Sequence, residues 1–453
     1  MVSSASAASS PKLSPDIRRH LWLHFTRGTG EVPVIVRAEG AYVYDEHGQR
    51  LLDGLSGLYC CNIGHCRAEI GAAMERQTRE LDFMPIWGFA HPRAVELAAR
   101  VADLAPGNLN RVFFTSGGSE AVESAIKLTR AFHRRTGHPR KTKFVTRSVA
   151  YHGTTLGALQ ATAIAALRAD FEPLVPGGVK VPNTNAYRWP ASRDPLWAAD
   201  AVEQAILLED PETVGAVIVE PVQNAGGCLV PQEGYFQRLR EICDRYDVLL
   251  IADEVICAWG RLGHYFGCER YGFEPDMITT AKAMASAYAP MGALVASDRI
   301  AEAFSADDQI FAHGFTFGGH PVAAAAALAN LDIFAAEDLC GQVLAREGEF
   351  RERLEGLRDL PIVGDVRGAG FFLAVELVAD ADTKRRLTPS QSERLTGGYL
   401  AHELIQAGLI CRVDGRGDPV VQLAPPLICG SEHFQEIAEI LRTVLARAWT
   451  TIN

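Results

Sequence analysis

Two carboxylates and one lysine stand where apolar stretches of the sequence turn polar, and these residue types can do chemistry there. Asp253 and Glu254 follow the apolar run VLLIA at 248–252, and Lys282 follows MITTA at 277–281. A buried carboxylate is costly unless a cation or strong hydrogen-bond donors meet it. Burial lowers the pKa of a lysine, and the neutral amine is a nucleophile toward carbonyl groups. A helix cap or a surface ion pair would also explain Asp253, and a lysine that extends into solvent would also explain Lys282.

Two further segments have the composition of ligand-binding turns. In TSGGSEA (115–121) a strand ends, two glycines follow, and a helix is expected to begin at Ser119. The free amide groups and the dipole of such a helix attract an anion, although the same residues also suit a plain glycine turn with a serine cap. In VAYHGTT (149–155) the aromatic Tyr151 follows a strand, and it either stacks on a flat ring or packs in the core. The segment is neither a P-loop nor a GxGxxG turn.

The elements that must position these residues alternate between strand and helix from about residue 111 to 297. Helices are expected at 119–135 and 235–246 between the strands. Because the strands are continuously apolar, we predict a mainly parallel sheet covered by helices on both faces, an α/β fold that binds ligands at the carboxyl ends of its strands. The expected strands are 111–115, 143–148, 214–220, 248–254, 277–282 and 292–297.

The rest of the chain is expected to form a smaller α+β domain from both termini. A hairpin is predicted in VIVRAEGAYVYDEHGQRLL (34–52), with DEHGQ as its turn, and another in LICRVDGRGDPVVQLAPPLI (409–428). The predicted division is an N-terminal arm, 1–32; the first part of the small domain, 33–69; a large cofactor-binding domain, 70–330; and the C-terminal small domain, 331–453.

Composition excludes several classes of protein. The 453 residues carry a formal net charge of −11, and such an acidic surface repels nucleic-acid phosphates. The ten cysteines form no CxxC pair or short-spaced framework, so reduced thiols in a cytoplasmic protein are expected. No apolar run reaches membrane-spanning length, and the Ser/Ala-rich start does not resemble a secretory signal.

Taken together, the four features describe one small ligand. It has a phosphate for the glycine turn, a carbonyl group for Lys282, a flat ring for Tyr151 and a cationic ring nitrogen for Asp253. Pyridoxal 5′-phosphate has all four groups. Asp253 would keep the ring nitrogen protonated, so that the ring withdraws electrons from a substrate carbanion.

The sequence resembles the class III aminotransferases of the ω-transaminase and β-alanine:pyruvate type, which have the fold-type-I architecture. The resemblance runs from about Pro33 to the C-terminus, and it is specific because a whole set of motifs occurs in order. These motifs are DGLSGLYCCNIGH, FFTSGGSEAVESA, YHGTT, EPVQNAGG, DEVICAWGRLG, PDMITTAK, HGFTFGGHPV and VVQLAPPL.

The resemblance implies a role for particular residues. Lys282 would form the Schiff base with the cofactor, and Thr316 would reach the phosphate of a neighbouring subunit. The protein would then be a homodimer with shared active sites, and the sequence leaves open whether dimers pair into tetramers. The remaining cofactor contacts implied are phosphate binding by Gly118 and Ser119, ring stacking by Tyr151, support of the ring nitrogen by Asp253 and Glu220, and packing on the other ring face by Val255.

The substrate pocket is less clearly marked. Tyr59, Trp87 and Ala225 fall at pocket positions of the family, although both aromatic residues also suit a protein core. A mobile arginine of the late hairpin often pairs with the acceptor's carboxylate in this family. Arg412 matches it best, but the hairpin is longer here and Arg416 is a rival; either residue would also suit a solvated loop.

One departure from the family lies beside the lysine. The family usually has glycine directly after the lysine and again before the next aromatic residue, where this chain has Ala283 and Ala287. Alanine restricts positive φ, so the lysine loop would have to shift if these positions needed glycine angles. This bears on the level of activity and on substrate access.

The expected activity is the transfer of an amino group from an ω-amino acid, diamine or primary amine to a keto acid, pyruvate rather than 2-oxoglutarate, in two ping-pong stages. An aminomutase or a decarboxylase would use the same cofactor. A nicotinamide-dependent oxidoreductase also fits a parallel α/β sheet, but it would need a GxGxxG turn, which the chain lacks. A non-catalytic relative is a further alternative, suggested only by Ala283 and Ala287.

Overall fold

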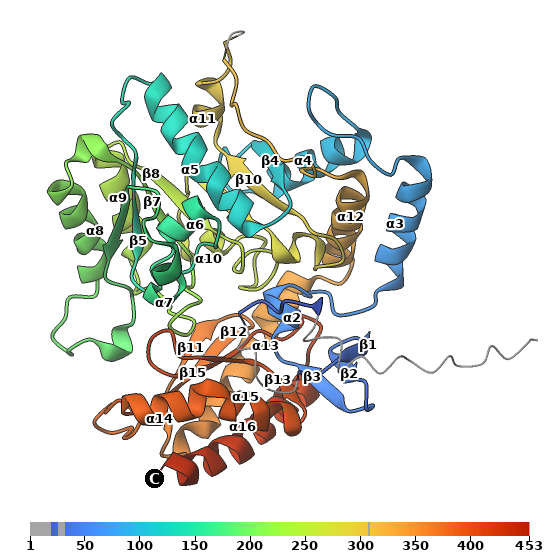
Figure 1. Cartoon of the computed structure of the whole chain (residues 1–453), viewed down its shortest axis with the longest axis vertical. Helices are drawn as coiled ribbons and strands as arrows, with labels where there is room; N and C mark the ends of the chain where they lie inside the picture. The colour runs from blue at the N-terminus through green and yellow to red at the C-terminus, as the bar shows by residue number, and fades with distance from the viewer. Residues whose placement is uncertain (1–19, 26–31, 307–308, 453) are drawn as a thin grey trace, which may run out of the picture.

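The computed structural model describes residues 20–25, 32–306 and 309–452, and its larger part is built on one seven-stranded sheet (Figure 1). The strand order is β4-β10-β9-β8-β7-β5-β6, and all neighbours from β9 to β6 are parallel. The expected mainly parallel α/β sheet is thus confirmed, with one short strand, β6, that the sequence did not reveal. The strands are β4 (Arg111–Thr115), β5 (Lys143–Arg147), β6 (Gly178–Val181), β7 (Val214–Val219), β8 (Leu249–Asp253), β9 (Met277–Thr280) and β10 (Gly292–Ala296).

Helices cover both faces of this sheet, because its central strands are apolar on both sides. Successive strand residues point to opposite faces: Ile218 of β7 packs with Ile126 of α5, whereas Val217 packs in the cluster that contains Leu239 of α9. The helices of this part are α3 (Ala68–Glu80), α4 (Pro92–Leu104), α5 (Gly118–Arg135), α6 (Leu156–Ala161), α7 (Ala165–Arg168), α8 (Trp197–Leu208), α9 (Tyr235–Arg245), α10 (Gly267–Tyr271), α11 (Asp298–Glu302) and α12 (Pro321–Ala336).

Strand β10 is reversed, and this places its first residue at the edge where β4 and β9 end. Gly292 is paired with Thr115, and the next residue is paired with Thr280. A Cβ atom on Gly292 would lie 2.7 Å from Thr115 Oγ1 and 3.0 Å from the carbonyl oxygen of Thr280. Glycine at 292 therefore permits the segments that follow β4 and β9 to leave the sheet close together.

A second part of the structure joins the two ends of the chain. Strand β13, near the C-terminus, lies parallel to β3 in the sheet β1-β2-β3-β13, and the sheet β11-β12-β15-β14 is antiparallel throughout. Both predicted hairpins are present, as β2–β3 and β14–β15. The strands are β1 (Ile35–Glu39), β2 (Tyr42–Asp45), β3 (Arg50–Asp53), β11 (Val363–Ala369), β12 (Phe372–Leu377), β13 (Leu409–Ile410), β14 (Arg412–Asp414) and β15 (Val420–Leu423).

Helices pack against these smaller sheets (Figure 1). They are α2 (Ser56–Tyr59), α13 (Leu339–Glu355), α14 (Pro389–Arg394), α15 (Leu400–Gln406) and α16 (Ser431–Ile452). Most of the predicted N-terminal arm, 1–19 and 26–31, lies outside the described residues. None of the helices in the described ranges has the length and apolar character needed to span a bilayer, and the ten cysteines are all free thiols.

Candidate active site

A cavity of about 130 Å³ lies at the carboxyl edge of the seven-stranded sheet. Lys282 and Asp253 both line it, although 28 residues separate them in the sequence. The cavity thus brings together every cofactor-binding residue expected from the sequence except Thr316. Its lining residues are Gly118, Ser119, Tyr151, His152, Gly153, Glu220, Asp253, Val255, Ile256 and Lys282.

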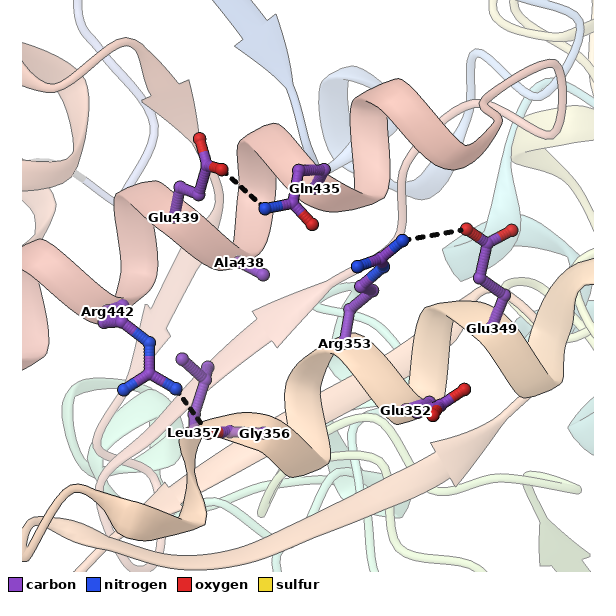
Figure 2. Close-up of a pocket in the computed structure, with 9 residues that line it drawn as sticks. All are labelled: Glu349, Glu352, Arg353, Gly356, Leu357, Gln435, Ala438, Glu439 and Arg442. Atoms are coloured by element: carbon purple, nitrogen blue, oxygen red, sulfur yellow. Dashed lines mark hydrogen bonds and ion pairs between the residues drawn. The ribbon is translucent and has the colours of Figure 1, made fainter.

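A larger surface groove, between α13 and α16, has none of these features (Figure 2). Several of the polar side chains that line it are already paired within their own helix. Arg353 pairs with Glu349, and Gln435 donates a hydrogen bond to Glu439. Because the groove has no buried unpaired group that would select a ligand, the smaller cavity is the candidate active site.

Lys282 reaches the cavity from a strained backbone position. Strand β9 ends at Thr280, two residues earlier than predicted, and Lys282 instead opens a short 3-10 turn, Lys282–Ala285. Its φ is +47°, in the left-handed region that residues with a side chain rarely adopt. Burial lowers the pKa of Lys282, while the nearby Asp253 acts in the opposite direction. The fraction of Lys282 in the neutral amine form is therefore higher than for a lysine in water.

The second charged group, Asp253, ends β8 and is almost fully buried. Its Oδ2 atom lies 2.6 Å from Nδ1 of His152, and its Oδ1 atom accepts a hydrogen bond from the amide of Val255. Glu220 lies nearby, and burial raises the pKa of that carboxyl group, with the Asp253 charge adding to the effect. The imidazole thus holds the Asp253 carboxylate in a fixed orientation toward the cavity.

The N-terminus of α5 forms another wall. Gly117 precedes the helix and offers no side chain to cap its first turn, so amide groups remain available beside Gly118 and Ser119. Gly118 also lies close to the aliphatic side chain of Val255: a Cβ atom at 118 would be 2.9 Å from it. The Ser119 hydroxyl accepts a hydrogen bond from the amide of Thr154. An anion at this helix end would meet both amides and the positive end of the helix dipole.

The two arginines of the β14–β15 hairpin lie near the cavity but differ in their contacts. The Arg416 guanidinium carbon is 6.0 Å from the centre of the Tyr151 ring, and its Nε donates to both carboxylate oxygens of Asp414, at 2.8 and 2.9 Å. The Nε atom of Arg412 is 3.8 Å from Asp414 Oδ2 and has no hydrogen-bond partner among the described residues. Arg412 also contributes to the lowering of the Lys282 pKa, after burial.

Four other predicted residues do not line the cavity. Tyr59 is a buried core residue whose hydroxyl donates to Gln422 Oε1 at 2.7 Å, and Ala225 is fully buried. Trp87 is 61 % exposed, and Thr316 is exposed as well. The single chain therefore leaves Thr316 and Trp87 free to meet another molecule, whereas Tyr59 already has its partner.

The two alanines that follow the lysine differ in their backbone. Ala287 has φ +61°, whereas Ala283 is absent from the residues with positive φ and lies buried in the 3-10 turn. Only position 287 thus has a conformation that favours glycine. The turn nevertheless retains Lys282 in the cavity, so alanine at 287 strains the turn without displacing the lysine.

Two site features were missed by the sequence reasoning. His152 binds Asp253, and its position directly after Tyr151, at the same strand end, was the available signal. The partner of Glu254 was also not predicted. Its two carboxylate oxygens accept hydrogen bonds from the amides of Gly267 and Cys268 at the start of α10. The adjacent carboxylates therefore have different functions, because Asp253 faces the cavity and Glu254 caps a helix.

These residues fit the pyridoxal phosphate expected from the sequence. The uncapped end of α5 suits its phosphate, Lys282 suits its aldehyde, and Asp253 suits its ring nitrogen. Glu220 Oε1 and His152 Nε2 are buried without a partner among the described residues, so the polar lining is not yet saturated. Hydrogen-bond donors, carboxylates and an aromatic ring thus line one cavity, as this ligand requires.

Comparison with known proteins places the chain in a family. Residues 26–445 match the family model described as aminotransferase class-III. A probable aminotransferase of Mycobacterium tuberculosis is 54 % identical, over 96 % of this chain and 95 % of the relative. The putrescine–pyruvate aminotransferase of Pseudomonas aeruginosa is 38 % identical, over 91 % and 90 %. The solved structure of a thermostable (S)-enantioselective ω-transaminase from Thermomicrobium roseum superimposes with a TM-score of 0.93 at 37 % identity, covering 98 % of this chain and 99 % of that one.

These matches cover both parts of the structure, including the segments that line the cavity. The family match spans both the seven-stranded sheet and the smaller sheets, and the solved relative covers nearly the whole chain. The protein therefore belongs to the class III aminotransferases, pyridoxal-phosphate-dependent enzymes that transfer amino groups between an amine donor and a keto acid.

Proposed function

We propose that this aminotransferase moves the amino group of an ω-amino acid, a diamine or a simple primary amine to pyruvate. The observation that carries the proposal is a partly buried arginine, Arg412, whose charge acts on Lys282 and whose Nε atom has no hydrogen-bond partner among the described residues. Its guanidinium is not bound tightly to Asp414, so it is available for the carboxylate of a keto acid at the mouth of the cavity. The match to a putrescine–pyruvate aminotransferase supports a diamine donor and pyruvate as the acceptor.

Each lining residue has a proposed task around the cofactor. The amides of Gly118 and Ser119 hold its phosphate, and Tyr151 and Val255 pack on opposite faces of its ring. Asp253, oriented by His152 and supported by Glu220, holds its ring nitrogen. The uncapped start of α5 supports the role of Gly118 and Ser119. The bond from Asp253 to His152 supports the role of Asp253.

Pyridoxal phosphate, when bound, supplies an aldehyde that accepts the donor's amino group and a ring that withdraws electrons. Lys282 holds the cofactor between reactions. Once displaced by the donor, its Nζ atom removes a proton from the donor's amine-bearing carbon and later returns one. The lowered pKa of Lys282 supports this role, because a neutral amine is needed to take up the proton.

A second copy of the chain is proposed to complete the site. Thr316 is exposed, and so are three large apolar side chains: Phe317, which follows it, Trp87, which contacts the same segment, and Phe89, two residues after Trp87. The Trp87 indole donates to the carbonyl oxygen of Phe315, which ties these segments together. A homodimer that covers this surface would bring Thr316 to the partner's phosphate site.

The experiment is a panel of amines tested against pyruvate and against 2-oxoglutarate, with alanine or glutamate measured as product. Pyruvate-dependent alanine formation from putrescine or β-alanine is expected. Lys282→Ala should abolish turnover and the visible absorbance of the bound cofactor. Lys180→Met is the matched control, since Lys180 is another buried lysine with a lowered pKa but lies in β6 outside the cavity. Consumption of an amino-acid donor that forms no alanine or glutamate, with the nitrogen retained in a decarboxylated amine or in an isomer, would instead indicate a decarboxylase or an aminomutase.

A further inference from the structure

The β14–β15 hairpin holds two arginines that compete for one buried carboxylate. Asp414 lies between them, with its side chain almost fully buried. Arg416 occupies it: the Arg416 amide and guanidinium both donate to Asp414, with contacts to each carboxylate oxygen. Arg412 stays outside this pair, 3.8 Å from Asp414 Oδ2. One arginine is thus neutralised within the hairpin while the other keeps its charge available.

The turn that carries Arg416 is anchored to the rest of the molecule. Asp418, two residues later, lies 3.0 Å from Nε of Arg188 and 2.8 Å from Nε of Arg386. Arg188 also pairs with Glu376, which is fully buried in β12. These contacts fix the turn from both sides, so Arg416 stays where it meets Asp414 and covers the Tyr151 ring.

The same buried carboxylate connects this network to the 225–227 segment, which does not line the cavity. Glu376 pairs with Arg367 as well as with Arg188. Arg367 donates to the carbonyl oxygens of Gly226 and Gly227, directly after Ala225. The turn and the 225–227 segment are therefore connected by one set of charged contacts.

We propose that Arg416 is a positioning residue: by occupying Asp414 it keeps the guanidinium of Arg412 available for the carboxylate of the acceptor. The inference rests on the proposed function, in which Arg412 binds that carboxylate. Without Arg416, Asp414 would be a buried carboxylate with no hydrogen-bonded cation, and Arg412, 3.8 Å away, is the cation beside it. Asp414 would then capture Arg412 and compete, as an intramolecular carboxylate, with the substrate.

The test uses the cofactor-loaded enzyme and two variants. Arg416→Gln should raise KM for pyruvate about tenfold while leaving KM for a neutral amine donor unchanged within about twofold. The dissociation constant of propionate, an unreactive carboxylate measured by calorimetry, should rise in parallel. The double variant Asp414→Asn/Arg416→Gln removes the competing charge and should return both values to within about threefold of wild type. A double variant as weak as the single one would overturn the inference, because Arg416 would then contact the carboxylate itself.

Two controls separate this inference from the proposed function and from folding. Arg412→Gln should weaken propionate binding in every background; if wild type neither binds propionate nor uses pyruvate, the proposed function fails first. In that case a crystal structure of Arg416→Gln still decides the inference, since Arg412 must move to within hydrogen-bond distance of Asp414. An unchanged 3.8 Å separation would overturn it. Arg140→Gln removes an exposed ion pair with Asp210 that is not part of this network and should leave pyruvate KM nearly unchanged.

Discussion

Replacement of Ala287 by glycine is expected to stabilise the protein. Ala287 has φ +61°, and the left-handed conformation costs a residue with a side chain about 1–2 kcal/mol. Glycine removes that cost, but it also raises the conformational entropy of the unfolded chain, which lowers the free energy of unfolding by about 0.4–1 kcal/mol. The free energy of unfolding should therefore rise by about 0.8 kcal/mol, the middle of the range that these two terms give.

Ala283→Gly is the matched control, because it is the other alanine that stands where the family usually has glycine. It has ordinary φ and is buried, so glycine there brings no relief of strain. The loss of a buried methyl group and the gain in unfolded-state entropy should together lower the free energy of unfolding by about 1.5 kcal/mol.

The assay is urea unfolding of both variants and wild type, each with and without saturating pyridoxal phosphate. The two midpoints should move in opposite directions in both conditions. If both variants were destabilised alike, the strain assigned to the lysine turn would be refuted. A shift present only with cofactor would also count against it, since backbone strain does not depend on the ligand.

Three further outcomes are expected. Tyr59→Phe should lower the free energy of unfolding by about 1–3 kcal/mol, because Gln422 loses its buried partner; KM for amine donors should stay unchanged in initial-rate kinetics if Tyr59 is a core residue. His152→Ala should lower kcat by about 100-fold, since Asp253 loses the bond that orients it, while circular dichroism shows an intact fold. Burial raises the pKa of Glu254 to about 7, above its ordinary value of 4.5, so the folded protein keeps a proton that the unfolded chain loses. Relative to Glu254→Gln, the free energy of unfolding of wild type should therefore fall by about 3 kcal/mol from about pH 4.5 to pH 7, as measured by denaturant titration.

The sequence was informative where the fold leaves little choice. In a parallel sheet the residues that follow several strands must meet at one edge, so Asp253, Lys282 and the 115–121 turn were expected together before any contact was known. The mainly parallel order also follows from apolar runs of strand length, whereas the reversed direction of β10 was not predicted. The short strand β6 was missed, because four residues with a central lysine give no clear pattern.

What the sequence could not supply were contacts between distant side chains. The bond from His152 to Asp253 depends on how two strand ends face each other, and the pairing of Arg416 with Asp414 depends on the shape of one turn. The end of β9 was placed two residues late, since Ala281 continues the apolar run although the backbone has already left the sheet. The roles assigned to the site residues remain predictions that the proposed variants test.

Gly292 bears on the candidate active site although it does not line the cavity. A methyl group there would push apart the segment that leads from β4 to α5 and the segment that leads from β9 to Lys282. Neither segment would lose a reactive atom, but Gly118 and Lys282 would no longer keep their positions relative to each other. The relative placement of the two segments that carry Gly118 and Lys282 thus depends on a residue without a side chain, on the strand that lies between them.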